Sequence, residues 1–405
     1  MKRREFLMGT AALGLAGPAL PQRAAAQAAS ATLMKFVPQA NLSALDPVWT
    51  TATVTNNHGY YVFDMLFGTD EKLKPQPQMA EGHEVSADGK TWRIKLREGL
   101  MFHDGTPVKA ADCAASLKRW TQRDPYGQLL GRAVEEWGAP DERTVQIKLK
   151  RPFPMMLDCL AKSDQPPVIM PERLAKTDAN TQVTEMIGSG PYKFVAADYV
   201  SGSRVAYEKF DGYKPRSEPP SRNAGGKVAH FKRIEWHVLP DPATAAAALT
   251  TGEVDWWERP LADLQPMLAS NPDIKQEVID KAGHGSIIRL NHLQPPFNNP
   301  KIRAAVRMAV KQEDYMRATQ GDDTTLWQTC RNLWWRGTPY YDGEQEDLMP
   351  QSLEKAKAAL KESGYNGEKV VIINPTDFPD IGPLGEVTFE LLKKLGMNVE
   401  MAASD

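Results

Sequence analysis

Cysteine is scarce in this chain: its 405 residues include only three, at positions 113, 159 and 330. Three thiols allow at most one disulfide bridge and leave one cysteine over, which excludes a scaffold held by several disulfides. Cys113 replaces an apolar residue on one face of an expected helix, and this position favours a buried, unreactive thiol. Whether Cys159 pairs with Cys330 stays open.

An excess of charge of either sign is also missing. The chain has 49 basic and 51 acidic residues, which gives a formal net charge of -2. Such a balance produces no global field that would favour nucleic acid or an anionic membrane as a partner. Hydrophobic content of 41% and charged content of 25% are typical of a globular chain. The length exceeds the roughly 250 to 300 residues at which one hydrophobic core stops growing, so we expect more than one domain.

The sequence also lacks the common catalytic and metal-binding motifs. It has no Walker loop, no G-x-S-x-G elbow and no H-E-x-x-H pair. Pro191 directly follows the glycine-serine-glycine of residues 188–190, which forbids the helix that a nucleophile elbow needs. His103 and Asp104 lie in a turn without a third ligand at metal-binding spacing. We therefore predict no catalytic residue, no metal site and no cofactor.

A long hydrophobic run is absent too. The apolar run near the N-terminus covers residues 7–17, whereas a membrane-spanning helix needs roughly 20 apolar residues. Arg3 and Arg4 precede this run, which is typical of a twin-arginine export signal. Ala24 and Ala26 provide the small residues of a cleavage site. Together these features predict that the chain is exported.

Cleavage after the second of these alanines would remove a signal peptide of residues 1–26. A lipid-anchored protein would need a cysteine near this point, and the sequence has none there. We therefore predict a soluble protein in the periplasm, without a lipid anchor.

The most specific pattern present is W-R-I-K-L-R-E-G-L-M-F-H-D-G-T-P-V-K-A-A-D, at residues 92–112. Apolar and basic residues alternate over 92–97, which predicts a half-buried strand. The glycines and the aspartate at 98–105 favour turns. Apolar residues then recur at helical spacing over 110–120. The block therefore predicts a strand, a double turn and a helix.

The rest of the chain divides into two patterns. Before residue 287 we expect helical spacing at 58–66, strands at 144–149, 192–195, 204–207, 234–238 and 254–257, and a helix that begins at Pro242. Beyond it we expect helices at 302–310, 353–360 and 387–395, a buried strand at 370–373 and a further strand at 398–401. This alternation of helices and strands predicts an α/β domain with largely parallel strands.

Four more segments accompany the 92–112 block in a recognisable order. They are N-L followed by L-D-P at 41–47, G-S-G-P-Y at 188–192, G-E-V-D at 252–255, and P-F-N-N-P followed by I-R-A-A at 296–305. In sequence and in order they resemble the landmarks of the family 5 extracellular solute-binding proteins, the oligopeptide and dipeptide receptors of bacterial ABC importers. The resemblance covers nearly the whole chain.

The resemblance implies a mixed α/β fold, the three-domain, two-lobed periplasmic binding protein fold of type II. After the signal peptide, its domains would be domain I at 27–68 and 188–287, domain II at 69–187 and domain III at 288–405. In the family the chain then returns to domain I, and that later segment supplies several ligand contacts. This sequence has no counterpart of it, so we expect domain III to be incomplete and the chain to be truncated.

The same resemblance places the ligand between the two lobes, against the residues that follow the Val-Asp pair. Here these residues are Trp256, Trp257 and Glu258. Neighbouring residues of a strand point to opposite faces, so we expect one tryptophan to fill the core and the other to face out.

Other cleft positions of the family correspond to Tyr126, to Thr50 and Thr51, and to Asn291 and His292 at a strand that enters domain III. Tyr126 also fits a plain surface turn, because it lies in D-P-Y-G. These five residues complete the predicted ligand-binding set.

The predicted function is a monomeric receptor that captures a small solute, a peptide in most of the family, and delivers it to permease subunits and their ATPases in the inner membrane. A sugar or a metal chelate stays open as the cargo, because aromatic rings stack on sugar faces and some relatives carry chelates. A secreted hydrolase with Asp255 and Glu258 as acid and base is the rival from another class. A binding module without transport is a third reading.

Overall fold

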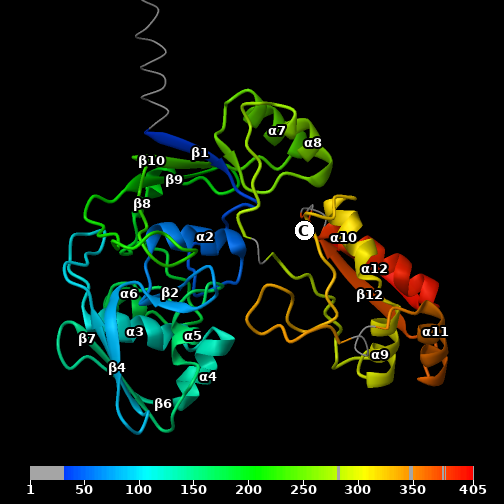
Figure 1. The fold of residues 1–405 in the computed structure, drawn as a ribbon, viewed down its shortest axis with the longest axis horizontal. Helices are drawn as coiled ribbons and strands as arrows, with labels where there is room; N and C mark the ends of the chain where they lie inside the picture. The colour runs from blue at the N-terminus through cyan, green and yellow to red at the C-terminus, as the bar shows by residue number, and fades with distance from the viewer. Residues whose placement is uncertain (1–31, 281–282, 346–349, 376–377, 379, 405) are drawn as a thin grey trace, which may run out of the picture.

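The computed structural model describes residues 32–280, 283–345, 350–375, 378 and 380–404. The predicted export signal, with Arg3, Arg4, Ala24 and Ala26, lies outside the described residues. Figure 1 shows a mixed α/β chain in two lobes: the blue-to-green part of the chain forms the first lobe, and the yellow-to-red part forms the second.

The first lobe contains a mixed five-stranded sheet. Its order is β11-β1-β10-β9-β8, with β1 (Leu33–Val37), β8 (Tyr192–Phe194), β9 (Arg204–Lys209), β10 (Arg233–His237) and β11 (Trp256–Trp257). β1 runs parallel to β10 and to β11, whereas β9 is antiparallel to β10 and β8. The predicted strands at 192–195 and 204–207 are confirmed as β8 and β9, and they pair with each other. The sheet joins the start of the described chain to strands that come much later.

The helices packed near this sheet are α2 (Thr53–Val62), α7 (Pro242–Thr250) and α8 (Gln265–Ala269), with the 3-10 turns η1 (Ala196–Asp198) and η2 (Ala262–Leu264). α7 begins as predicted: Pro242 stands in its first turn and Asp241 accepts a hydrogen bond from the Thr244 N–H. Gly252 follows its end at a φ of +74°, which suits glycine.

The helix expected at 58–66 lies earlier in the chain than predicted, because α2 begins at Thr53 and ends at Val62, and Phe63 is already extended. The Val62 carbonyl accepts a hydrogen bond from the Gly190 N–H at 2.9 Å, and Asp64 forms a β-bridge with Ile169. Tertiary hydrogen bonds thus replace the helical ones that the apolar spacing favours.

A second, antiparallel sheet lies at the other end of this lobe (Figure 1). Its order is β4-β5-β7-β6, with β4 (Ala80–Val85), β5 (Thr91–Leu96), β6 (Val134–Gly138) and β7 (Thr144–Leu149). Around it lie α3 (Ala110–Trp120), α4 (Pro125–Ala133), α5 (Met156–Leu160), α6 (Glu172–Ala175) and the ribbon of β2 (Phe67–Thr69) with β3 (Pro75–Pro77). The predicted strand, double turn and helix are confirmed, and Gly99 and Gly105 have φ values of +71° and +85°.

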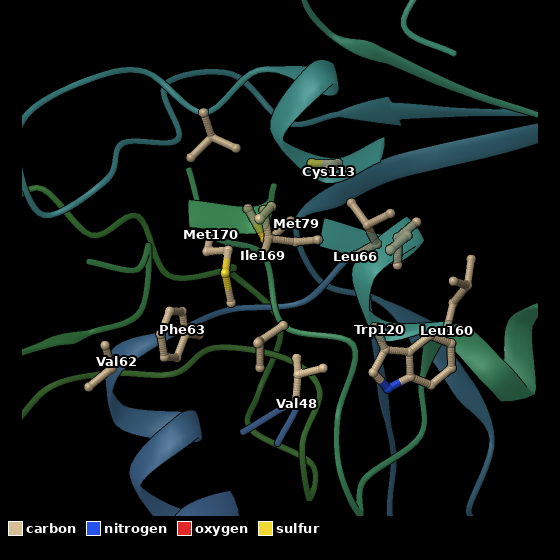
Figure 2. Close-up of a cluster of buried hydrophobic side chains, with 14 of the residues drawn as sticks. Val48, Val62, Phe63, Leu66, Met79, Cys113, Trp120, Leu160, Ile169 and Met170 are labelled. Carbon is tan, nitrogen blue, oxygen red and sulfur yellow. The ribbon is translucent and has the colours of Figure 1, made fainter. Parts of the chain in front are cut away.

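One hydrophobic cluster runs through both sheets, from Phe36 on β1 to Ile147 on β7. Figure 2 shows its middle, where Phe63 at the end of α2 and Trp120 at the end of α3 belong to the same cluster of buried side chains. The expected division of domain I from domain II at residues 68 and 69 therefore passes through a shared core.

The three cysteines are free, and Cys113 and Cys159 are buried. Burial raises the pKa of the Cys113 thiol, and it raises the pKa of Cys159 to about 12. The prediction of a buried thiol at Cys113 is confirmed, and the raised pKa disfavours the reactive thiolate.

A buried ion pair ties two of the sequence landmarks together. The carboxylate of Asp46, from the L-D-P segment, accepts hydrogen bonds from Arg119 on α3 at 2.6 and 3.3 Å. The Val48 and Val183 N–H groups donate to the same carboxylate, while Arg119 also donates to backbone carbonyls. Both side chains are nearly inaccessible to solvent, at 0% and 1%. This pair has the full set of partners that a buried charge needs.

A buried histidine joins two other landmarks. His103 Nδ1 accepts from the Gly188 N–H at 3.4 Å, so Nε2 carries the proton and donates to the Gly190 carbonyl at 3.0 Å. Burial lowers the pKa of His103 to about 4, which keeps the imidazole neutral. A Cβ at Gly190 would lie 2.5 Å from the Tyr61 carbonyl oxygen, so close backbone approach requires glycine there.

The second lobe consists of α9 (Pro300–Ala309), α10 (Gln312–Gln320), α11 (Leu353–Glu362), β12 (Lys369–Pro375), α12 (Gly382–Leu395) and β13 (Asn398–Ser404). β12 and β13 pair in parallel, as predicted. Its core is a separate cluster that includes Phe297, Ile302, Leu360 and Leu392.

Two predictions for this lobe are wrong. The strand at 370–373 is buried on one face only: Val370 is 4% exposed, whereas Val371 and Ile373 are 50% and 76% exposed. Asn291 and His292 do not lie on a strand but in a turn, in which the Asn291 side chain accepts a hydrogen bond from the Leu293 N–H at 3.0 Å. Asparagine favours such turns because its side chain bonds the backbone two residues on.

Candidate ligand-binding site

Three parallel strands of the first lobe, β11, β1 and β10, end at the same edge of the sheet. Open α/β sheets bind ligands outside the carboxyl ends of their strands. Here the segments that leave this edge begin with Pro38 after β1 and with Glu258 after β11. The predicted residues Trp256, Trp257 and Glu258 therefore lie where the topology favours a site.

Trp256 and Trp257 point to opposite sides of the sheet, as expected from strand geometry. Trp257 is 9% exposed and packs in a hydrophobic cluster with Val37, Val254 and Leu268. Trp256 is 40% exposed, with its ring edge-on to Phe36 at 5.3 Å between centroids. Of the two rings, Trp256 is thus the one that a ligand could reach.

Glu258 connects three segments of the first lobe. Its Oε2 accepts a hydrogen bond from the Gln39 N–H at 2.9 Å, and its Oε1 accepts one from Asn57 Nδ2 on α2 at 2.8 Å. Its own N–H donates to the Val37 carbonyl at 3.0 Å. Burial raises the pKa of nearby Tyr61, and the negative charge of Glu258 raises it further. Glu258 therefore anchors the end of β11 to the end of β1 and to α2.

The next residue, Arg259, contacts the second lobe. Its Nη1 lies 3.5 Å from Oδ2 of Asp380, which precedes α12, and its Nη2 lies 3.4 Å from His284 Nε2. The side chains of Arg259 and Asp380 are 31% and 33% exposed. Sequence reasoning missed Arg259, although a basic residue two places after the second tryptophan of the expected cleft segment was a signal that could have found it.

The other predicted residues of the first lobe lie near the start of α2 and the start of α4. The Thr50 hydroxyl accepts a hydrogen bond from the Ala52 N–H at 3.2 Å, and Thr51 is exposed. Tyr126 is 37% exposed in the first turn of α4. Within the described residues, no hydrogen bond, ion pair or ring contact joins these three side chains to residues 256–259.

A loop of the second lobe comes close to Tyr126. Burial raises the pKa of Tyr340, and its proximity to Asp158 on α5 and to Tyr126 raises it further. Tyr340 is 54% exposed and packs against Trp334 at 5.0 Å between ring centroids. The loop of the second lobe that carries Trp334 and Tyr340 therefore approaches α4 and α5 of the first lobe.

A hollow of about 260 Å³ lies elsewhere, between the turns that follow β5 and the turn that precedes β7. Its charged side chains are paired with each other, as in Lys109 with Glu142 and Arg143 with Glu98. It contains none of the predicted ligand-binding residues. We therefore do not assign the ligand to it.

No group of three or more His, Cys, Asp or Glu side chains in the described residues could hold a metal ion. No helix in the same residues is long and apolar enough to cross a membrane.

Residues 74–405 match the family described as bacterial extracellular solute-binding proteins, family 5. The chain belongs to this family. A relative from Sinorhizobium fredii, named a probable peptide ABC transporter periplasmic-binding protein, is 38% identical over 411 residues, which cover 100% of this chain and 76% of the relative. The family name and this name both describe binding proteins.

Solved structures of similar proteins give the fold. The periplasmic binding protein DppA from Helicobacter pylori, in complex with the peptide STSA, is 23% identical with a TM-score of 0.75, over 92% of this chain and 74% of DppA. AgaA from A. tumefaciens, in complex with agropinic acid, is 24% identical with a TM-score of 0.73, over 92% of this chain and 73% of AgaA. The predicted family and the mixed α/β, two-lobed fold are confirmed.

Proposed function

We propose that this family 5 protein is the periplasmic receptor of an ABC importer and that it binds a peptide between its two lobes. The observation that carries the proposal is the 38% identity, over the whole chain, to a relative named a probable peptide ABC transporter periplasmic-binding protein. By this proposal its partners are the permease subunits and ATPases of the inner membrane.

The geometry supports a mechanism of closure around the ligand. Trp256 and Arg259 extend from the carboxyl edge of the first-lobe sheet, and Arg259 already contacts Asp380 of the second lobe. A ligand that contacts both lobes is bound better by the closed form than by the open form, so it shifts the population toward closure. The permease would then recognise the closed form.

The hydrolase alternative has little support from the two carboxylates that it would use. Asp255 accepts a hydrogen bond from the Lys35 N–H at 2.7 Å, and both oxygens of Glu258 are occupied by Gln39 and Asn57. A general acid needs a proton that it can deliver to a substrate. These carboxylates hold strands together instead, so we propose a binding role without catalysis.

The experiment that tests the function is native mass spectrometry of protein purified from the periplasm, compared with its denatured mass. We expect a bound molecule that fragments as a peptide, and a mature chain that begins at Gln27. A sugar or a metal chelate in its place would keep the receptor and overturn the peptide. Protein that stays in the cytoplasm would overturn the periplasmic location.

A further inference from the structure

Arg259 is held at both ends of its backbone. On one side Glu258 is bonded to β1 and α2, as described above. On the other side the carbonyl of Pro260 accepts a hydrogen bond from Gln265 Nε2 at 3.4 Å, and the ring of this proline restricts the backbone further. The guanidinium is therefore presented from a fixed position at the edge of the sheet.

The contacts of this guanidinium are few and long. It carries five N–H donors, and the structure shows one contact of 3.5 Å to Asp380 and one of 3.4 Å to His284. Charge-assisted hydrogen bonds between such groups are typically about 2.7 to 2.9 Å long. Asp380 is thus a weakly bound counterion, and N–H donors of Arg259 remain available to another acceptor.

We propose that Arg259 determines specificity by binding a carboxylate of the ligand in place of its contact with Asp380. This inference rests on the proposed function. A guanidinium is planar and binds a carboxylate through two parallel hydrogen bonds, a geometry that the single contact with Asp380 does not use. The ligand class is a peptide with a free carboxylate.

The replacement of Asp380 by a ligand carboxylate at Arg259 also explains why Asp380 belongs to the other lobe. A ligand carboxylate that approaches Arg259 repels Asp380, so ligand binding replaces a contact between lobes by a contact within the first lobe. An exposed ion pair is weak, so its loss costs the protein little. The remaining contacts of the ligand must then hold the second lobe in the closed form.

The test uses two pools of tetrapeptides of random sequence, one with free C-terminal carboxylates and one with C-terminal amides, both without Asp or Glu. The pools are titrated against ligand-stripped full-length protein, followed by tryptophan fluorescence and native mass spectrometry. The variants are Arg259→Met, Arg259→Lys and Asp380→Asn. The control is Arg173→Met, which removes an exposed ion pair with Glu185 elsewhere.

We expect wild-type protein to favour the free-acid pool, and Arg259→Met to lose roughly 10- to 100-fold in affinity for that pool alone. Arg259→Lys should lose less, because it keeps the charge without the planar donor pair. Asp380→Asn should bind the free-acid pool up to roughly fivefold more tightly, and Arg173→Met should bind like the wild type.

Two results would overturn the inference alone, and a third would overturn the proposed function together with it. Equal binding of both pools by wild-type protein, or an equal loss of both pools in Arg259→Met, removes the role of Arg259 and leaves the peptide receptor intact. Binding of neither pool by wild-type protein overturns the peptide function itself, and the inference with it.

Discussion

Two carboxylate–guanidinium pairs of this molecule differ in their surroundings. Inside the first lobe, Asp46 and Arg119 are 0% and 1% exposed and share two hydrogen bonds, the shorter of 2.6 Å. Between the lobes, Arg259 and Asp380 are 31% and 33% exposed and meet through one contact of 3.5 Å. Removing one partner of a buried pair leaves an uncompensated charge, whereas an exposed pair contributes little. The first pair is permanent, and the second can exchange its partner.

The difference between the two ion pairs agrees with the packing of the two lobes. The first lobe has a cluster that joins its two sheets, and His103 and Asp46 tie distant segments across it. The second lobe has its own core. Rigid lobes with a weak contact between them are the arrangement that hinge closure requires.

The largest expected effect comes from breaking the buried pair. Asp46→Ala leaves the Arg119 guanidinium buried without its carboxylate, so the free energy of unfolding should fall by about 3 to 5 kcal/mol. Urea unfolding, followed by circular dichroism, measures the change. The double variant Asp46→Leu with Arg119→Met should lose less than the single one, because no charge stays buried. A loss below 1 kcal/mol in Asp46→Ala would show that water reaches the pair.

The second effect is a loss of stability in acid. Burial lowers the pKa of His103 to about 4 and that of His58 to about 3, whereas histidine in an unfolded chain titrates near 6.5. Below pH 6.5 the unfolded chain therefore binds protons that the folded chain does not, and stability falls as the pH falls. From pH 6.5 to 5 each histidine should cost about 2 kcal/mol.

Unfolding titrations between pH 5 and 8 test this prediction, with His103→Gln as the decisive variant. Its stability should depend less on pH than that of the wild type, because one of the two buried imidazoles is gone. An unchanged slope would mean that folding does not lower the pKa of His103.

The contacts between distant segments show how far the sequence can predict the structure. Local patterns were sufficient for the 92–97 strand, the turns at Gly99 and Gly105 and the helix at 110–120, because their causes lie within a few residues. The side chain of Asn291 likewise forms its turn with the backbone two residues on, but the family resemblance led us to expect a strand there. The end of α2 depended on Gly190, which no local pattern relates to Val62.

The residues of the candidate site also divide into features that the local pattern predicts and features that depend on distant segments. Strand alternation predicted that Trp256 and Trp257 would face opposite sides, and it could not say which ring is buried, because that depends on α7 and α8. Glu258 was expected to face the ligand, but its partners Gln39 and Asn57 come from other segments and hold it. The partner of Arg259, Asp380, lies in the other lobe, so only the folded structure identifies Arg259 as a candidate site residue.

A smaller effect should follow from removing the anchor of the site. Glu258→Ala leaves the Gln39 N–H and the Asn57 amide without their acceptor, at a cost of about 1 to 2 kcal/mol in the free energy of unfolding. Peptide affinity should fall as well, because Arg259 loses its fixed backbone. Glu253→Ala is the matched control, an exposed glutamate of the same segment. Equal effects in both variants would remove Glu258 from the site.

The smallest effect on stability should come from the contact between the lobes, and it separates the two kinds of pair most sharply. Asp380→Asn should change the free energy of unfolding by less than about 1 kcal/mol, because the pair is partly exposed and singly bonded. The ligand-free protein should nevertheless populate the open form more, which small-angle X-ray scattering detects as a larger radius of gyration. Glu185→Gln, which removes the partner of Arg173 within the first lobe, should leave that radius unchanged. If Asp380→Asn lowered stability as much as Asp46→Ala, the contact between the lobes would be permanent, and the exchange of Asp380 for a ligand carboxylate at Arg259 would be ruled out.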